Sequence, residues 1–320
     1  MNKDILFHTI RNSAFLLSSL FLGNPGLFAQ RIVDVKYQSG AKGAYLFTAY
    51  NHAYCNYILE VHFTTFNNVK SDRTLPYRAE VKPGMNTLFS ISPVNPNDPV
   101  QFNYASSYNK GCIYPRPDTN FTYLLPVTPG KEVQAYELSP DRPVTGAVQQ
   151  NSWYMIRLRM KPGDTIYAAR RGVVTEVEEN DVTNDAGLAS AGSENYVEIV
   201  HADCSFGRYG ILKKNGALVK AGQQVKAGEP VGIVGGDKYG RGSDIRISVY
   251  YNQEEDVSQN GDNIWKMDRV YIPLQFWTKN NGKGKLKNGA LYTSEFPLSV
   301  VNQETKTSAK TKKGKAKTKK

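Results

Sequence analysis

Short hydrophobic runs separated by polar turn residues indicate that the first part of the chain is rich in β-strands. Residues 44–50 (AYLFTAY), 57–63 (YILEVHF) and 87–92 (TLFSIS) are rich in aromatic and β-branched side chains, with Asn, Gly and Pro between them. No window in this region keeps the 3.6-residue period of an amphipathic helix. The pattern predicts an all-β, sandwich-like domain over residues 30–140, followed by a linker at 141–150.

The region from residue 151 to residue 300 has the same strand-like pattern with a different use of glycine. Residues 155–160 (MIRLRM) alternate apolar side chains with Arg at a period of two, which is typical of a strand with one polar face. Val219, Val225 and Val231 are each followed three or four residues later by Gly, which lets a sheet turn sharply. The pattern predicts an antiparallel β core of the barrel-sandwich type with a C-terminal extension.

The N-terminal segment has the features of a secretory signal. Lys3 and Arg11 precede an apolar run at residues 14–23, which is about half of the roughly twenty residues that cross a bilayer. We expect a signal peptide over residues 1–29 and therefore export to the periplasm or cell envelope. An uncleaved membrane anchor is the alternative.

The positive charge of the chain is concentrated at its C-terminus. The formal net charge is +11, and residues 306–320 contain eight Lys and no acidic residue. This segment has no apolar residue larger than Ala, so we expect a disordered tail over residues 301–320. The tail could bind an anionic surface or simply keep the protein soluble. Because the rest of the chain is close to neutral, nucleic acid is not an expected partner.

Three cysteines remain after export, namely Cys55, Cys112 and Cys204. An oxidising compartment favours one disulfide and one remaining thiol. Cys55 and Cys112 lie in the same predicted domain and are therefore the predicted pair. Cys204 would then be a buried thiol.

Two strand motifs of the second region are distinctive, namely 162–169 (PGDTIYAA) and 195–201 (NYVEIVH). Through them, residues 155–252 resemble the core of the M23 (LytM/lysostaphin-like) peptidoglycan endopeptidases. Two other motifs depart from it. The family usually has YAHL where residues 209–212 read YGIL, and HLH where residues 244–246 read DIR. The resemblance implies an M23-like antiparallel β-sheet whose site residues have changed.

Catalysis in that family needs a Zn²⁺ held by a His, an Asp and the second His of HLH. The resemblance assigns the former zinc and catalytic positions to four residues of this chain: Arg157, Ile211, Asp244 and Arg246. Arginine stays protonated and has no lone pair to donate to a metal. His201 is the one His of this region and a candidate for lining the groove. The resemblance therefore implies no catalytic residue and no cofactor.

If Arg157, Asp244 and Arg246 converge, they could form a salt-bridged plug between strands or a pocket for anions. We expect an exported, non-catalytic M23-like protein that binds peptidoglycan peptide, or a cell-wall amidase or other hydrolase, as a scaffold or regulator. One alternative is an active peptidoglycan metalloendopeptidase with an unrecognised zinc site. A second alternative is a structural component of the cell envelope.

Overall fold

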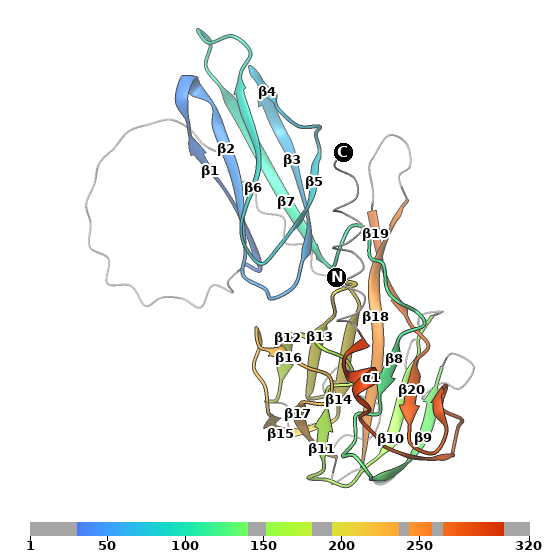
Figure 1. Ribbon diagram of the computed structural model, residues 1–320. Coiled ribbons are helices and arrows are strands. Elements are labelled where there is room, and N and C mark those ends of the chain that lie inside the picture. Colours follow the sequence, from blue (N-terminus) through green and yellow to red (C-terminus); the bar gives the residue numbers. More distant parts are fainter. Residues whose placement is uncertain (1–30, 140–151, 181–193, 237–242, 258–264, 304–320) are drawn as a thin grey trace, which may run out of the picture. The chain divides into compact units, whose positions relative to one another are not determined.

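The computed structural model describes residues 31–139, 152–180, 194–236, 243–257 and 265–303. The chain divides into two compact units, Met1–Ile113 and Tyr114–Lys320 (Figure 1). The predicted signal peptide, the predicted linker and the Lys-rich segment 306–320 lie outside the described residues. Within the described ranges, no helix has the length and apolar character that a membrane crossing requires.

The first unit consists of two antiparallel sheets. One has the strand order β1-β2-β6-β4 and the other the order β5-β3-β7. The strands are β1 (Val33–Ser39), β2 (Tyr45–Asn51), β3 (Tyr57–Asn67), β4 (Val69–Ser71), β5 (Tyr77–Val81), β6 (Gly84–Pro93) and β7 (Gln101–Lys110), with a 3-10 helix η1 at Ala41–Gly43. Phe47 on β2 stacks on Phe89 at 4.6 Å and contacts Phe63 of the other sheet at 5.7 Å. These aromatic contacts join the two sheets into a sandwich.

The second unit is built on a nine-stranded sheet. Eight strands follow the order β16-β12-β13-β14-β18-β10-β9-β22, and β19 also pairs with β18. Their bounds are β9 (Glu132–Leu138), β10 (Met155–Arg159), β12 (Gly172–Glu178), β13 (Tyr196–Val200), β14 (Phe206–Gly210), β16 (Gln224–Val225), β18 (Asp244–Asp256), β19 (Trp265–Tyr271) and β22 (Leu291–Thr293).

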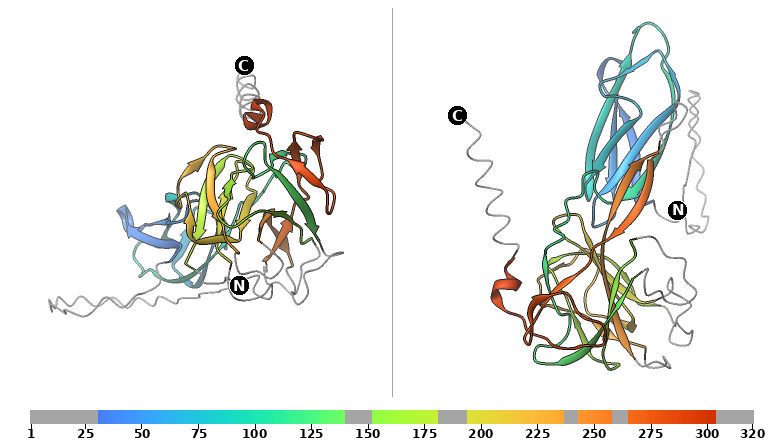
Figure 2. Two further views of the ribbon diagram at one scale, coloured as in Figure 1. Left: turned by 90° about the horizontal axis from the view of Figure 1, so that it is seen from below. Right: turned by 90° about the vertical axis from the view of Figure 1, so that its right-hand side faces the viewer.

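Two three-stranded sheets and a short helix complete the second unit. The sheets have the orders β11-β17-β15 and β21-β20-β8. Their elements are β8 (Thr122–Leu124), β11 (Thr165–Tyr167), β15 (Leu212–Ala217), β17 (Pro230–Val234), β20 (Gln275–Thr278), β21 (Gly282–Gly284) and α1 (Leu298–Val301). Both views of Figure 2 show α1, in red, at the periphery of this unit. The regular secondary structure of the described residues is almost entirely β-strand, which confirms the predicted all-β class.

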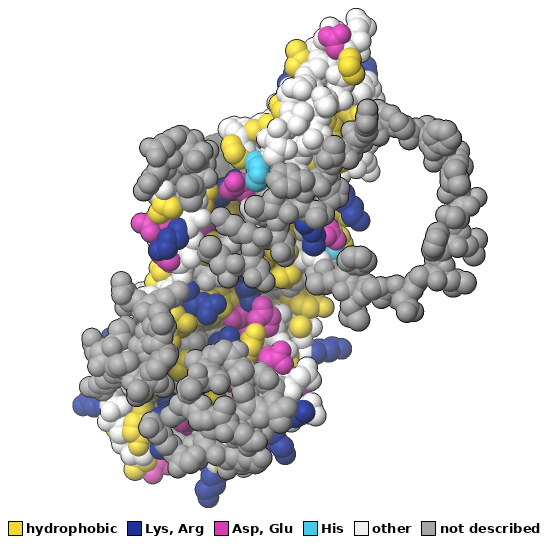
Figure 3. Space-filling view, turned by 180° about the vertical axis from the view of Figure 1, so that it is seen from behind, with side chains coloured by type: hydrophobic (Ala, Val, Ile, Leu, Met, Phe, Trp, Pro, Cys, Tyr) yellow, Lys and Arg dark blue, Asp and Glu magenta, His cyan; other side chains and the backbone are white. Residues whose placement is uncertain are grey.

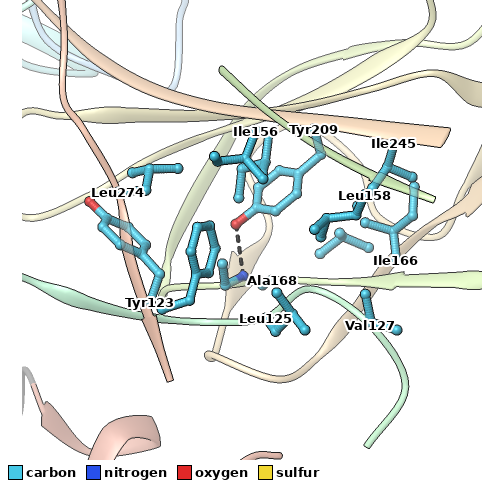
Figure 4. Packing of buried hydrophobic residues seen from close by; sticks show 14 of the residues in the cluster. Tyr123, Leu125, Val127, Ile156, Leu158, Ile166, Ala168, Tyr209, Ile245 and Leu274 are labelled. Carbon is cyan, nitrogen blue, oxygen red and sulfur yellow. Dashed lines mark hydrogen bonds between the residues drawn. The ribbon is translucent and has the colours of Figure 1, made fainter. Parts of the chain in front are cut away.

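The core of the second unit lies on one face of the nine-stranded sheet. Ile156, Leu158 and Ile245 are fully buried there, and Figure 4 shows them around Tyr209. The hydroxyl of Tyr209 accepts a hydrogen bond from the backbone N–H of Ala169 at 2.8 Å. The buried hydroxyl of Tyr209 therefore has a hydrogen-bond partner inside the apolar core.

The boundary between the units differs from the predicted linker at residues 141–150. The units divide between Ile113 and Tyr114. The strands that follow, β8 and β9, pair with β20, β10 and β22 and so complete sheets of the second unit. The sequence pattern does not show which sheet these residues join.

Candidate functional site

One face of the nine-stranded sheet is charged, whereas the opposite face packs into the core. On β10, Ile156 and Leu158 belong to the core, and Arg157 lies between them on the other face. The same alternation on β18 places Asp244 and Arg246 on the charged face. The arrangement follows from the two-residue period of a strand.

The pairing of β10 with β18 brings together three residues that the sequence analysis named. Arg157 lies directly opposite Arg246, and two like charges in this position repel each other. Asp244 offsets that repulsion. Its Oδ2 lies 3.3 Å from Nε of Arg157, and its Oδ1 lies 3.9 Å from Nε of Arg246.

Glu194, just before β13, supplies a second carboxylate. Its Oε2 accepts a hydrogen bond from Nη1 of Arg246 at 3.1 Å. Its Oε1 lies 3.9 Å from Nε of Arg208. We call these five residues the arginine–carboxylate cluster: Arg157, Glu194, Arg208, Asp244 and Arg246.

The cluster is largely withdrawn from solvent. Asp244 is 4% exposed, Glu194 7% and Arg246 8%. Burial raises the pKa of Asp244 and of Glu194, and the neighbouring arginines offset only part of that shift. Keeping the buried carboxylates ionised costs free energy. The positive charges of the neighbouring guanidinium groups offset part of this cost.

Two tyrosines lie against the arginines at the sides of the cluster. The guanidinium of Arg157 lies over the ring of Tyr136 at 4.8 Å, and that of Arg208 lies over the ring of Tyr196 at 3.6 Å. Stacking occupies the flat faces of the guanidinium groups and leaves their in-plane N–H donors available.

Three buried polar atoms of the cluster have no hydrogen-bond partner among the described residues. They are Nε of Arg157, Oδ1 of Asp244 and Nε of Arg246. The ion-pair distances are short enough for attraction, but the geometry does not give a hydrogen bond at these atoms. Unsatisfied charged atoms of this kind indicate a place for water or a ligand.

Ile211 contributes bulk to this region and no charge. It follows Gly210, which pairs with Arg246. Its side chain is 3% exposed, and its backbone has a φ of +69°. A β-branched residue rarely adopts this left-handed conformation, so the backbone here is strained. The carbonyl oxygen of Ile211 accepts a hydrogen bond from Gly235 at 2.9 Å.

His201 is buried away from solvent, whereas the sequence analysis named it as a groove-lining candidate. It is 3% exposed, and its Nδ1 lies 2.8 Å from the carbonyl oxygen of Arg171. Because a carbonyl only accepts, Nδ1 is the protonated nitrogen. Burial, together with the charge of Arg170, lowers the pKa of His201 to about 3. The ring is therefore neutral at physiological pH.

The predicted disulfide between Cys55 and Cys112 is wrong. Cys112 and Cys204 are the disulfide-bonded cysteines, and Cys55 is not part of a disulfide. The prediction assumed that the pair would lie within one domain. Within the second unit, however, the backbone N–H of Arg116 donates to the carbonyl oxygen of Asp203 at 3.3 Å. The segment just after Cys112 thus runs beside the residue that precedes Cys204.

Exposed charges of both signs are mixed on the face of the molecule shown in Figure 3. The described side chains on that face form no uniformly basic surface of the kind that binds nucleic acid. The buried arginine–carboxylate cluster is thus a better candidate site than the visible surface charges.

Comparison with known proteins identifies the region that contains the cluster. Residues 151–258 match the model of peptidase family M23. We name residues 151–258 the M23 domain after this match. A search of curated proteins gives no match.

Solved structures similar to this chain include three bacterial proteins. The catalytic domain of the antimicrobial peptidase lysostaphin from Staphylococcus simulans is 20% identical, with 37% of this chain and 78% of that chain covered, at a TM-score of 0.27. The catalytic domain of the prophage-encoded M23 protein EnpA from Enterococcus faecalis is 21% identical, with 48% and 93% covered, at 0.26. Csd3 from Helicobacter pylori is 12% identical, with 88% and 83% covered, at 0.29. The assignment of the M23 domain rests on the sequence match and not on these low scores.

The residues at the former zinc positions do not fit a zinc ion. Protein zinc sites use lone pairs of His, Cys or carboxylate side chains. Of the four positions that the M23 resemblance indicates, only Asp244 has such a group, while Arg157 and Arg246 would repel a dication. In the described ranges, no group of three or more His, Cys, Asp and Glu side chains is placed to hold a metal.

The absence of a side chain at Gly210 leaves space for the carboxylate of Glu194. The family motif usually has Ala at this position. A Cβ added at Gly210 would lie 2.6 Å from Oε1 of Glu194, which is closer than real Cβ contacts. The glycine and the buried Glu194 are thus matched to each other, and both accompany the arginine at residue 246.

The sequence analysis did not single out Glu194, Arg208, Tyr136 or Tyr196. Glu194 lies two residues before Tyr196 and four before Glu198, so the strand period puts all three on one face. Arg208 pairs with Glu198 across β13 and β14. Alternation alone could have found Glu194, whereas Arg208 and Tyr136 required the register between strands.

Proposed function

We propose that this chain is an exported, non-catalytic M23-like protein that binds peptidoglycan peptide, or a cell-wall hydrolase, through the arginine–carboxylate cluster. The observation that supports the proposal is the pair of arginines, Arg157 and Arg246, opposite each other at former zinc positions. Both carry a fixed positive charge and neither can coordinate a metal. A site with this composition can bind an anion but cannot activate water by the family mechanism.

The chemistry of the cluster suits a carboxylate ligand. Guanidinium groups bind carboxylates through charge-assisted hydrogen bonds. Nε of Arg157 and Nε of Arg246 are donors without a hydrogen-bond partner among the described residues. Peptidoglycan stem peptides and acidic side chains of a partner protein both offer carboxylates.

The Lys-rich segment 306–320 would contribute a separate, electrostatic contact. Eight lysines in fifteen residues suit an anionic envelope surface and should be sensitive to salt. Binding through the arginine–carboxylate cluster and binding through the Lys-rich segment can therefore be separated by varying the salt concentration.

Co-sedimentation of the full chain with purified wall sacculi tests the proposal. The compared proteins are the wild type, Arg157→Gln/Arg246→Gln, a chain lacking residues 306–320, and the matched control Lys266→Gln, whose side chain is 58% exposed. We expect the double variant to lose binding at high salt while the control retains it. Retention of full binding by a folded double variant would refute the role of the cluster.

A purely structural role for the cluster is the second candidate, because its ion pairs join β10 to β18. In that case the double variant would lose stability but would keep its sacculus binding. An unrecognised metallopeptidase site would show itself as about one zinc per chain by elemental analysis, reduced in His201→Ala.

A further inference from the structure

Three buried atoms of the cluster lack a hydrogen-bond partner within the described ranges, and a simple anion cannot satisfy all three. Nε of Arg157 and Nε of Arg246 are donors, whereas Oδ1 of Asp244 is an acceptor. A simple carboxylate such as acetate can satisfy the two donors and leaves Oδ1 of Asp244 unsatisfied. The complementary ligand has both a hydrogen-bond donor and an anionic acceptor.

The spacing of these atoms limits how far apart the two ligand groups can be. Oδ1 of Asp244 and Nε of Arg246 are 3.9 Å apart. That distance is too long for a direct hydrogen bond and short enough for neighbouring groups of one ligand residue to meet both atoms. The donor and the acceptor must therefore lie within a few bonds of each other.

The charge of the cluster determines the charge of the ligand. Three guanidinium groups and two carboxylates leave one positive charge in excess. Arg159, opposite Asp244 in the register, adds a second positive charge nearby, and a ligand with one net negative charge therefore offsets part of this excess. A neutral interior stretch of peptide does not.

We propose that the arginine–carboxylate cluster binds the carboxy-terminal residue of a peptide, with the terminal carboxylate accepting from Arg157 and Arg246 and the last backbone N–H donating to Asp244. This residue has an N–H and a carboxylate on the same α-carbon and one net negative charge. An acidic side chain has the charge, but its own N–H is separated from the carboxylate by additional carbons. The inference rests on the proposed function and specifies the ligand class of the same site.

Tyr136 supports this mode of binding. Its ring holds the flat face of Arg157, so the in-plane N–H edge of this guanidinium is directed by stacking before a ligand arrives. A guanidinium held in this way discriminates a planar carboxylate better than a mobile one does.

Titration calorimetry of the full chain with three matched ligands tests the inference. The ligands are N-acetyl-alanyl-alanine, its carboxy-terminal amide, and N-acetyl-alanyl-lactate, in which an ester oxygen replaces the last N–H. We use D and L forms of each. In the wild type, the amide and the ester should each bind about tenfold more weakly than the free acid, because each lacks one charge-assisted hydrogen bond.

Substitutions assign each contact to its residue. Asp244→Leu, which has no acceptor, should lose the preference for the acid over the ester, and Arg246→Gln should reduce the preference for the acid over the amide. Equal affinity of the wild type for acid, amide and ester would overturn the inference, and this comparison does not depend on whether a variant folds. If the three ligands bind equally but sacculus binding still depends on the cluster, the inference fails and the proposed function stands. If the ligand preference and the sacculus binding are both absent, the inference and the proposed function are both refuted.

Discussion

Replacing Arg246 with Met removes the charge that faces Glu194 and keeps an apolar side chain of similar length. Nη1 of Arg246 lies 3.1 Å from Oε2 of Glu194, and the two side chains are 9% and 7% exposed. Removing one member of a buried ion pair costs about 3–5 kcal/mol, because the remaining charge stays buried without its partner. Arg208 lies 3.9 Å from Glu194 and offsets part of this cost. We therefore expect the free energy of unfolding to fall by about 3 kcal/mol.

Urea unfolding followed by tryptophan fluorescence measures this loss in the second unit. The three tryptophans of the chain, Trp153, Trp265 and Trp277, all lie in that unit. The double variant Arg246→Met/Glu194→Gln should recover most of the stability, because it removes both charges. A single-variant loss below about 1 kcal/mol, the range of a surface pair, would refute the reasoning. A double variant as unstable as the single one would refute it as well.

An exposed ion pair provides the matched control. Nζ of Lys266 lies 3.0 Å from Oδ2 of Asp268, but these side chains are 58% and 42% exposed. Lys266→Met should cause no measurable change in the unfolding midpoint, because solvent already screens the pair. A change as large as that of Arg246→Met would show that burial is not the cause.

Three further predictions concern the second unit. His201 titrates at 6.5 when unfolded, but burial lowers its pKa to about 3 in the fold; protonation of the unfolded chain should therefore reduce stability as pH falls, by about 2 kcal/mol at pH 5. His201→Asn should flatten the difference in stability between pH 7 and pH 5, and an unchanged slope would contradict the assignment. Tyr209→Phe should cost about 1–3 kcal/mol in urea unfolding, because the buried N–H of Ala169 loses its acceptor; a neutral effect would mean that another acceptor replaces the hydroxyl. Gly210→Ala would place a methyl group 2.6 Å from Oε1 of Glu194, so it should destabilise the unit, and much less in a Glu194→Ala background.

The all-β class and the convergence of Arg157, Asp244 and Arg246 could be read from the sequence. Both depend on local periodicity and on motifs whose spacing survives in the M23 domain. The alternation of residues 155–160 predicts one polar face on this strand, and the structure places Arg157 on such a face.

The domain boundary and the disulfide could not be read in the same way. β9 pairs with β22, although more than 150 residues separate Gln134 from Leu291. Long-range pairing of this kind leaves no local signal in the sequence. The error in the cysteine pairing has a similar origin, because the prediction assumed that two cysteines of one predicted domain pair with each other.

Comparison with the family motifs could not have found Glu194. It shows which residues stand at former ligand positions, but Glu194 lies beside those positions and outside the compared motifs. The one related signal in the sequence is Gly210, where the family motif has Ala. Its meaning becomes clear only from the short distance between a Cβ at this position and the carboxylate of Glu194.

The most direct test of the central claim is the release of soluble peptide fragments from purified sacculi by the full chain in the presence of added zinc. We predict no release above the protein-free control, because Arg157 and Arg246 stand at positions that the M23 resemblance assigns to metal ligands, and arginine cannot coordinate a metal. Release that requires zinc and is abolished by a chelator would contradict the account.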